Sequence, residues 1–228
     1  MLNQFSRTEA LIGKENQDKL KKAKVAVFGL GGVGGHTVEA LARAGIGHLV
    51  LVDYDSYDIT NINRQIGALH STIGRYKVEV MKERILDINP NAIVEISRPE
   101  EIEGEESSVV DSTFTYVVDA IDTIANKIAL IEKCKNENVK IITMTGAGNK
   151  LDATKFEVTD IYKTSVCPVC RILRKELKNR GIKKLKVVYS KEIPLKSQTE
   201  EKVLASISFV PSVAGLIGAG EVIKDIIK

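Results

Sequence analysis

Residues 25–53 read VAVFGLGGVGGHTVEALARAGIGHLVLVD, and this stretch predicts a strand, a glycine turn, a helix and a second strand. Residues 25–28 form a short apolar run, typical of a parallel strand that is buried on both faces. Gly29, Gly31 and Gly34 then spell G-x-G-x-x-G. The first glycine permits a tight turn, the second lets backbone approach a phosphate, and the third lets the helix pack on the strand. Because these amides open a helix, an anion is favoured there, and we predict a nucleotide site.

An acidic residue follows the second strand at the distance that nucleotide-binding folds use. The helix after the turn places Val38 and Leu41 on one face, and Gly45 can end it. Residues 49–52 then form a strand that delivers Asp53, whose carboxylate can accept a hydrogen bond from a ribose hydroxyl. A tight turn without a ligand would explain the glycines but not this acid. The motif does not say which nucleotide binds.

The composition describes an ordinary soluble protein. The chain has 228 residues, which suits one α/β domain, with 28% charged and 5% aromatic residues. The first 24 residues are polar and ionic, without the apolar core of a secretion signal, so we expect a cytoplasmic protein. The odd number of cysteines, three, then predicts reduced thiols.

Hydrophobic periodicity predicts an α/β fold, a Rossmann-like and mostly parallel sheet with helices on both faces and a C-terminal extension. We divide a single domain into an N-terminal helical segment (1–22), a nucleotide-binding core (23–160) and a C-terminal part (161–228) with a basic helix, a mobile loop and a strand followed by a helix. The further predicted helices span 5–20, 73–88, 123–138 and 170–180, and the further strands span 92–96, 116–120 and 139–144.

One stretch is apolar enough to raise the question of a membrane span. Residues 203–220 carry no charge over 18 positions. Pro211 interrupts them, and serines and small residues make them only moderately apolar. We therefore expect no membrane contact, but a buried strand that runs into a terminal helix in the core or at a subunit interface.

Two cations follow the ribose strand where a dehydrogenase would more usually continue into an ordinary second βα unit. Arg64 can donate two hydrogen bonds to a phosphate, and Lys77 can act on it as a point charge. Both suit a triphosphate, although local sequence alone allows them to decorate a turn and a helix face. Asp122 lies at the predicted end of the 116–120 strand, where it could hold Mg²⁺ between phosphates or cap the next helix.

Taken together, these residues resemble the adenylating superfamily of ubiquitin-activating enzymes and bacterial sulfur-carrier activators. The resemblance covers about residues 5–160 and implies ATP with Mg²⁺, a homodimer, and attack of a substrate carboxylate on the α-phosphate. It implies an Mg²⁺ ligand, Asp122, and an arginine, Arg7, that enters the partner subunit's site; from position alone, Arg7 reads as a solvated charge. The other residues implied at the nucleotide are Gly29, Gly31, Gly32, Gly34, Asp53, Asp55, Asn61, Arg64, Gln65 and Lys77.

The second half of the chain resembles one branch of that superfamily. Residues 158–165 (VTDIYKTS), 187–190 (VVYS) and the closing SISFVPSVAGLIGAGEVIKDI are similar to the bacterial tRNA threonylcarbamoyladenosine dehydratases. That family implies ATP-dependent activation of the threonyl carboxylate on a modified adenosine in tRNA, followed by ring closure with loss of water. Attack within one substrate needs no protein nucleophile, because aligned groups reach effective molarities on the order of 10⁵ M or more.

A basic run independently favours a nucleic-acid substrate. Residues 171–191 contain nine cations and one acid, Glu176, a local charge of +8 in a chain whose total is +3, so the remainder carries −5. Concentrated positive charge suits a surface that follows phosphates, although a solvated lysine-rich helix would have the same composition.

Two of the three cysteines form a C-x-x-C pair, Cys167 and Cys170, that departs from the dehydratase pattern. Sulfur-carrier activators hold zinc with two such pairs, whereas here Cys134 is the only further thiol. Inert thiols at a helix start are the favoured interpretation, with zinc binding and a redox pair as alternatives.

Two other functions remain open. An adenylating activator of a small sulfur-carrier protein would carry zinc and respond to a carrier ending in Gly-Gly, and a non-catalytic nucleotide sensor would bind ATP without releasing pyrophosphate. An NAD dehydrogenase fits the glycine turn but leaves Arg64, Lys77 and Asp122 without a shared role. A sulfur-relay or cysteine desulfurase partner is compatible with the resemblance, and the sequence does not identify one.

Overall fold

The structure, a computed structural model, describes residues 2–98, 105–196 and 204–228. Seven strands form one sheet in the order β3-β2-β1-β4-β5-β7-β6. All neighbouring strands are parallel except β6, which runs antiparallel to β7. The strands are β1 (Lys24–Phe28), β2 (His48–Val52), β3 (Ile93–Ser97), β4 (Tyr116–Asp119), β5 (Ile141–Met144), β6 (Phe156–Asp160) and β7 (Lys186–Ser190).

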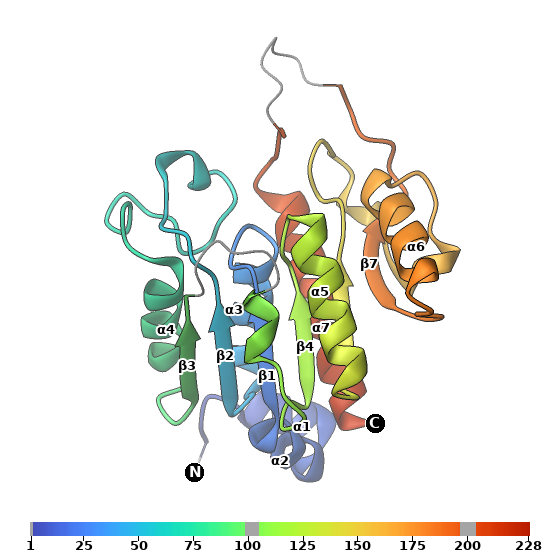
Figure 1. The fold of residues 1–228 in the computed structure, drawn as a ribbon. Helices are drawn as coiled ribbons and strands as arrows, with labels where there is room; N and C mark the ends of the chain where they lie inside the picture. Colours follow the sequence, from blue (N-terminus) through green and yellow to red (C-terminus); the bar gives the residue numbers. More distant parts are fainter. Residues whose placement is uncertain (1, 99–104, 197–203) are drawn as a thin grey trace.

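Helices cover both faces of this sheet, which confirms the predicted Rossmann-like class (Figure 1). The helices are α1 (Ser6–Ile12), α2 (Lys14–Lys22), α3 (Gly34–Ala44), α4 (Lys77–Ile88), α5 (Ile124–Asn136), α6 (Pro168–Asn179) and α7 (Phe209–Ile227), with short 3₁₀ turns at Ile59–Asn61, Glu105–Val109, Ala153–Lys155 and Ile161–Lys163. Buried side chains of α3, α4 and α7 join one core cluster, and those of α5 and α6 join the other.

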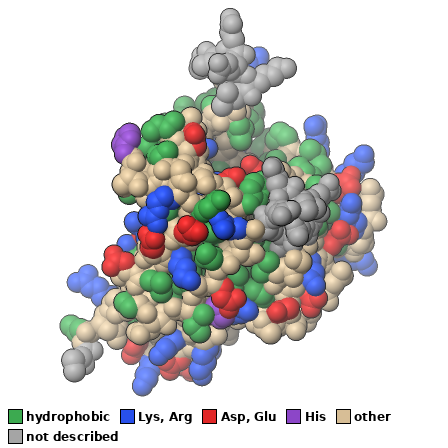
Figure 2. All heavy atoms as spheres, turned by 60° about the vertical axis from the view of Figure 1, so that its left-hand side comes forward, with side chains coloured by type: hydrophobic (Ala, Val, Ile, Leu, Met, Phe, Trp, Pro, Cys, Tyr) green, Lys and Arg blue, Asp and Glu red, His purple; other side chains and the backbone are tan. Residues whose placement is uncertain are grey.

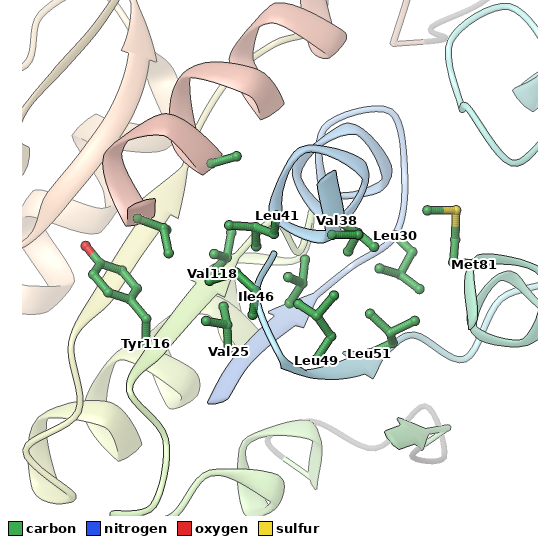
Figure 3. Close-up of a cluster of buried hydrophobic side chains, with 14 of the residues drawn as sticks. Val25, Leu30, Val38, Leu41, Ile46, Leu49, Leu51, Met81, Tyr116 and Val118 are labelled. Carbon is green, nitrogen blue, oxygen red and sulfur yellow. The ribbon is translucent and has the colours of Figure 1, made fainter. Parts of the chain in front are cut away.

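The core cluster on the α3 face helps to explain why β1 is apolar at each of positions 25–28 (Figure 3). Val25 and Val27 of β1 point into it, whereas Ala26 and Phe28 point into the cluster on the opposite face. All four are fully buried, as expected for a strand with helices on both sides. Strand β1 therefore lies at the centre of the molecule, and its carboxyl end is held in a fixed position.

The strand order reverses at β1, which lies between β2 and β4. In open α/β sheets, ligands bind beyond the carboxyl ends of the strands at such a point. The glycine turn follows β1 there, and residues 120–122 follow β4. The topology thus places two predicted site segments side by side.

The N-terminal segment is helical, as predicted, but it forms two helices and not one continuous helix. The helices α1 and α2 meet at Gly13, which has a φ of +83° and interrupts the regular backbone. Leu11 of α1 is 85% exposed, whereas Leu20 of α2 is fully buried.

The predicted strand before the terminal helix is also absent from described residues 204–208. Backbone there pairs instead with a loop, because Asn149 N donates to Ala205 O at 2.8 Å. Helix α7 packs tightly on α3: a Cβ on Gly215 would lie 2.3 Å from Val33 O, and Thr37 donates to the Gly215 carbonyl. The terminal helix therefore belongs to the core, as one of the two predictions had it.

Other boundaries differ by a few residues. The helix predicted from residue 73 begins at Lys77, because Gly74, with a φ of +85°, lies in a turn before it. The helix predicted from Cys170 begins at Pro168. Most of the acidic segment 99–106 and half of the predicted mobile loop 191–202 lie outside the described residues. Within the described ranges, no helix combines the length and apolar character that a membrane crossing requires.

Candidate functional site

A cavity of about 860 Å³ opens at the carboxyl edge of the sheet, where the strand order reverses. Most of the predicted nucleotide-site residues line it, namely Gly29, Gly31, Gly32, Asp53, Asp55, Asn61, Arg64, Gln65, Lys77 and Asp122. They come from positions that span nearly a hundred residues of the chain. The fold therefore gathers one site from segments that the sequence keeps apart.

The three motif glycines play different geometric parts. Gly29 has a φ of +82°, and a Cβ there would lie 2.6 Å from Ala120 O. A Cβ on Gly34 would lie 1.8 Å from Gly29 O, so the third glycine allows α3 to approach β1, as predicted. Gly34 itself does not line the cavity. Gly31 has open space, with its nearest neighbour 3.9 Å away, and a ligand can approach its backbone closely.

Asp53 is tied to the glycine turn by its carboxylate. Its Oδ2 accepts from Leu30 N at 2.6 Å, and its Oδ1 accepts from Asp55 N at 2.8 Å. Burial raises the pKa of Asp53, and the nearby Lys77 and the two amides offset only part of that effect. Each oxygen keeps a free lone pair, so the carboxylate can still accept from a ligand hydroxyl.

Lys77 begins α4 with its ammonium inside the cavity wall. The side chain is 7% exposed, and its Nζ lies 2.5 Å from Asp55 Oδ2 and 3.9 Å from Asp53 Oδ1. A buried ammonium needs such anions, because removal from water is costly without them. The interpretation of Lys77 as a decoration of a helix face is therefore wrong.

The segment after β2 is built by local capping. Asp58 and Asn61 form a reciprocal capping box around the first 3₁₀ turn. Arg64 donates to Thr60 O at 3.0 Å and to Asn63 Oδ1 at 2.8 Å, which holds its guanidinium at the cavity. Gln65 is 7% exposed and its Oε1 has no hydrogen-bond partner among the described residues, so an acceptor remains available there.

Asp122 is exposed at the cavity, beyond the end of β4. The residue that caps α5 is Thr123, and no side chain makes a capping hydrogen bond there. The alternative that Asp122 caps this helix is therefore wrong, and its carboxylate is available to a ligand.

The cavity residues fit an Mg²⁺ ion that arrives with a nucleotide better than a resident metal. No group of three or more His, Cys, Asp or Glu side chains in the described residues could hold a metal by itself. Mg²⁺ commonly takes one or two protein carboxylates and completes its shell with phosphate oxygens and water. The exposed carboxylate of Asp122 meets that requirement, whereas the zinc alternative finds no four-thiolate site in the described chain.

Two buried lysines of the cavity wall were missed by the sequence reasoning. Lys127 of α5 is 2% exposed and donates to Asp119 Oδ1 at 3.0 Å and to Met144 O at 2.9 Å, so it joins the ends of β4 and β5. Lys150 is 4% exposed and donates to Glu192 O at 2.7 Å, and burial lowers its pKa. Nothing in the local sequence distinguishes these lysines from solvated ones.

Arg7 does not line this cavity. It is exposed on α1, which lies at the opposite edge of the sheet, near the start of β1 (Figure 1). Within one subunit, therefore, the structure does not bring Arg7 to the other predicted residues.

The nine cations of the basic run divide into two groups. Four are held by neighbours: Arg174 by Thr164, Arg180 by Glu176 and Glu132, Lys186 by Asp225 and Glu221, and Lys191 by Glu157. The other five are exposed, namely Arg171, Lys175, Lys178, Lys183 and Lys184. By contrast, the face that Figure 2 turns forward, on the β3 side of the molecule, shows cations and anions interspersed. The five define a basic surface on α6 and the loop after it.

Comparison with known proteins identifies the family to which this chain belongs. The profile of the ThiF family matches residues 5–228. The chain belongs to the ThiF family. The match spans the glycine turn, the cavity and the C-terminal part with α6 and α7, so one family profile covers both halves of the chain.

Members of the ThiF family similar to this chain carry informative names. A tRNA threonylcarbamoyladenosine dehydratase of Bacillus subtilis is 43% identical over 244 aligned positions, which cover 100% of this chain and 96% of that protein. The Escherichia coli tRNA N6-threonylcarbamoyladenosine dehydratase has been solved with AMP (TM-score 0.90, 34% identity) and with ATP (TM-score 0.88, 33% identity). Each covers 98% of this chain and 93% of the solved one.

Proposed function

We propose that this protein is an ATP-dependent tRNA threonylcarbamoyladenosine dehydratase. The observation that carries the proposal is the full-length similarity to proteins of that name, combined with a cavity that gathers the predicted nucleotide residues. The enzyme adenylates the carboxylate of threonylcarbamoyladenosine in tRNA and then closes a ring. A tRNA substrate also suits a cytoplasmic protein.

The reaction divides into two balanced steps. The substrate carboxylate attacks the α-phosphate of ATP, which forms an acyl adenylate and releases pyrophosphate. The neighbouring ureido group then attacks the acyl carbon and displaces AMP, so the elements of water leave the substrate. The protein's task is to align and stabilise, because the second attack occurs within one molecule.

The cavity residues divide the work on ATP. The open backbone at Gly31 borders the phosphates, and the carboxylate of Asp53 accepts from the ribose. Arg64, Lys77 and Asn61 bind phosphate oxygens and stabilise the charge that develops in the attack. The remaining predicted members, Gly29, Gly32, Gly34, Asp55 and Gln65, shape or support this wall.

Mg²⁺ would be held by Asp122 together with ATP phosphates, and when bound it neutralises charge on the phosphates. Lys77 must exchange its present anions for phosphate oxygens when ATP binds, because Asp55 and Asp53 now compensate its charge. Such an exchange keeps the ammonium paired throughout.

A homodimer completes the site in this proposal. Arg7 lies at the far edge of its own subunit, so it can reach a cavity only in a second copy. A two-fold axis would bring each Arg7 to the partner's ATP and create two equivalent composite sites. The basic surface would then bind tRNA phosphates beside the cavity wall, since α6 supplies Pro168 and Val169 to the cavity lining.

The deciding experiment measures AMP and pyrophosphate release from ATP with three substrates: threonylcarbamoylated tRNA, unmodified tRNA, and a small carrier protein ending in Gly-Gly. We expect release only with the modified tRNA, whose modified nucleoside loses the mass of one water. Asp122→Ala and Arg64→Ala should abolish release and keep the wild-type circular dichroism spectrum.

The other functions give different results in the same assay. Release that depends on the carrier protein would indicate a sulfur-carrier activator. ATP binding without release under any condition would indicate a nucleotide sensor.

A further inference from the structure

The chemistry proposed above uses no thiol, yet two cysteines stand at the cavity wall. Cys167 caps the N-terminus of α6 and Cys170 lies in its first turn. Residues three apart share one side of a helix, and the thiol of Cys170 donates a hydrogen bond to the sulfur of Cys167. All three cysteines of the chain are free thiols, so this pair is reduced in the structure.

Cys167 is the member of the pair that borders the cavity. It belongs to the cavity lining although it is only 4% exposed, whereas Cys170 is fully buried behind it. Space beside its sulfur is limited, because a Cβ on Gly146 would lie 2.9 Å from Cys167 Sγ. Because Cys167 lines the cavity, a reagent must be small to reach it from there. Cys170 does not line the cavity, so a reagent from the cavity meets Cys167 first.

The surroundings stabilise a thiolate on Cys167. The hydrogen bond from Cys170 lowers the pKa of Cys167 to about 6, with further help from the amides at the start of α6. The helix N-terminus and the buried Lys150, which interacts electrostatically with Cys167, add positive charge. The same hydrogen bond and burial raise the pKa of Cys170. One member is thus a nucleophile at neutral pH, and the other retains its proton.

The backbone before the pair is strained. Val166 has a φ of +44°, which is an outlier for a β-branched residue, and Gly146, which faces Cys167, has a φ of +50°. Such conformations are unfavourable in a non-glycine residue and cluster at functional sites. A structural cysteine pair needs no such arrangement, because a regular turn can also begin a helix.

We propose that Cys167 and Cys170 form a reversible disulfide in the cavity wall, with Cys167 as the attacking thiolate and Cys170 as the resolving thiol. Hydrogen peroxide is the oxidant. The Cys167 thiolate attacks one peroxide oxygen and becomes a sulfenic acid, while the other oxygen leaves and takes a proton as water. Cys170 then attacks that sulfur, the S–O bond breaks, and a second water departs. Two thiols are oxidised and one peroxide is reduced to two waters.

This inference goes beyond the proposed function. It assigns a modification site and requires neither ATP nor tRNA. Oxidation removes the negative charge of the Cys167 thiolate from the cavity wall beside Lys150. The redox state of the pair therefore changes the electrostatic potential in the cavity. Its test uses the full chain without nucleotide, so it can fail while the proposed dehydratase activity stands.

The main experiment exposes the full-length protein to a small excess of hydrogen peroxide at pH 7, followed by intact mass and peptide mapping. We expect the loss of two hydrogens, a Cys167–Cys170 linkage, and reversal by dithiothreitol. Cys134→Ser is the matched control and should behave like the wild type, because burial raises the pKa of Cys134 to about 12.

Single variants then assign the two roles. Cys170→Ser should stop at a sulfenic acid on Cys167 that dimedone traps, and Cys167→Ser should leave Cys170 reduced. No linkage in the wild type, a sulfenic acid on Cys170 first, or a tightly bound zinc that blocks oxidation would each overturn the proposal.

A second measurement avoids mutation altogether. Among the residues that the structure describes, Lys150 is the charged group that interacts with both cysteines, and Glu192 in turn interacts with Lys150. Alkylation of wild-type Cys167 by iodoacetamide should rise to half its maximum near pH 6 and exceed that of Cys134 at pH 7 by at least about tenfold. A rate that rises only above the pKa of an ordinary thiol would overturn the proposal.

Discussion

Two lysine–carboxylate clusters lie at opposite edges of the same sheet. At the carboxyl edge, Lys77 Nζ lies 2.5 Å from Asp55 and 3.9 Å from Asp53. At the other edge, where β4 and β7 begin, Lys186 Nζ lies 2.5 Å from Asp225 of α7. The residue types and the shortest distances are the same, so distance alone does not distinguish a binding site from a structural contact.

The carboxylates of the two clusters differ in how well their charge is compensated. Burial raises the pKa of Asp53, and its partners do not cancel that cost. Burial also acts on Asp225, but hydrogen bonds from Lys186, Tyr116 and Lys228 outweigh it and lower its pKa to about 2. The cavity cluster is therefore incompletely satisfied and open to a ligand, whereas the other cluster is a finished contact between α7 and the sheet.

The largest expected effect is a difference in enzymatic activity between variants of Lys77 and Lys186. Lys77→Met should reduce AMP release by roughly 100-fold to 1000-fold, because it removes charge stabilisation in the transition state. Lys186→Met should keep near wild-type turnover and lower the free energy of unfolding by about 1–2 kcal/mol. Steady-state kinetics and urea denaturation measure both. Equal losses of turnover in the two variants would contradict the distinction between a binding cluster at Lys77 and a structural cluster at Lys186.

Arg7 tests whether a residue at the far edge can act at the cavity. Arg7→Ala and Asp122→Ala should each be nearly inactive as homodimers, because each removes one half of a composite site. In an equal mixture, about half of the dimers are mixed and each has one intact site, so activity should recover to roughly a quarter of wild type.

Native mass spectrometry of the mixture provides the control for subunit exchange. Confirmed exchange without any recovery would mean that Arg7 acts within its own chain or has no role in the reaction.

The basic surface should show a smaller, salt-dependent effect. Replacing Lys175, Lys178, Lys183 and Lys184 with Glu should weaken tRNA binding and flatten its salt dependence, because each lost phosphate contact changes the log–log slope by roughly 0.7 to 0.9. ATP binding should not change. Lys186 is excluded from this set, since its ion pairs hold α7, and a charge reversal there would report on stability instead.

The smallest effect is a pH dependence of stability. Because the fold lowers the pKa of Asp225 from its usual value of 3.8 to about 2, the charged carboxylate stabilises the fold at pH values above 3.8. This contribution to stability disappears as the pH falls toward about 2. Asp225→Asn should therefore be less stable than wild type at pH 7, and the difference should shrink through that range. Asp53→Asn should show the opposite slope, because the raised pKa of Asp53 makes its charged form unfavourable in the fold. Thermal denaturation at several pH values measures both.

The sequence alone determined the strand–turn–helix around the glycines and the acid that follows it. These are local properties: a run of apolar residues marks a buried strand, and the backbone freedom at Gly29 and the missing side chain at Gly34 can be read from the residues themselves. The sheet class followed from the same periodicity. The sequence did not predict the break between α1 and α2 at Gly13, because a helix can either continue through a single glycine or end at it.

Only the tertiary structure decided which charged groups are available to a ligand. Lys186 and Lys184 are indistinguishable in sequence, yet one is paired with a carboxylate 39 residues away and the other is exposed. Likewise, Lys127 becomes a buried bridge only because β4 and β5 end beside each other. Such pairings depend on distances between segments remote in the chain, and those distances exist only once the helices have packed on both faces of the sheet.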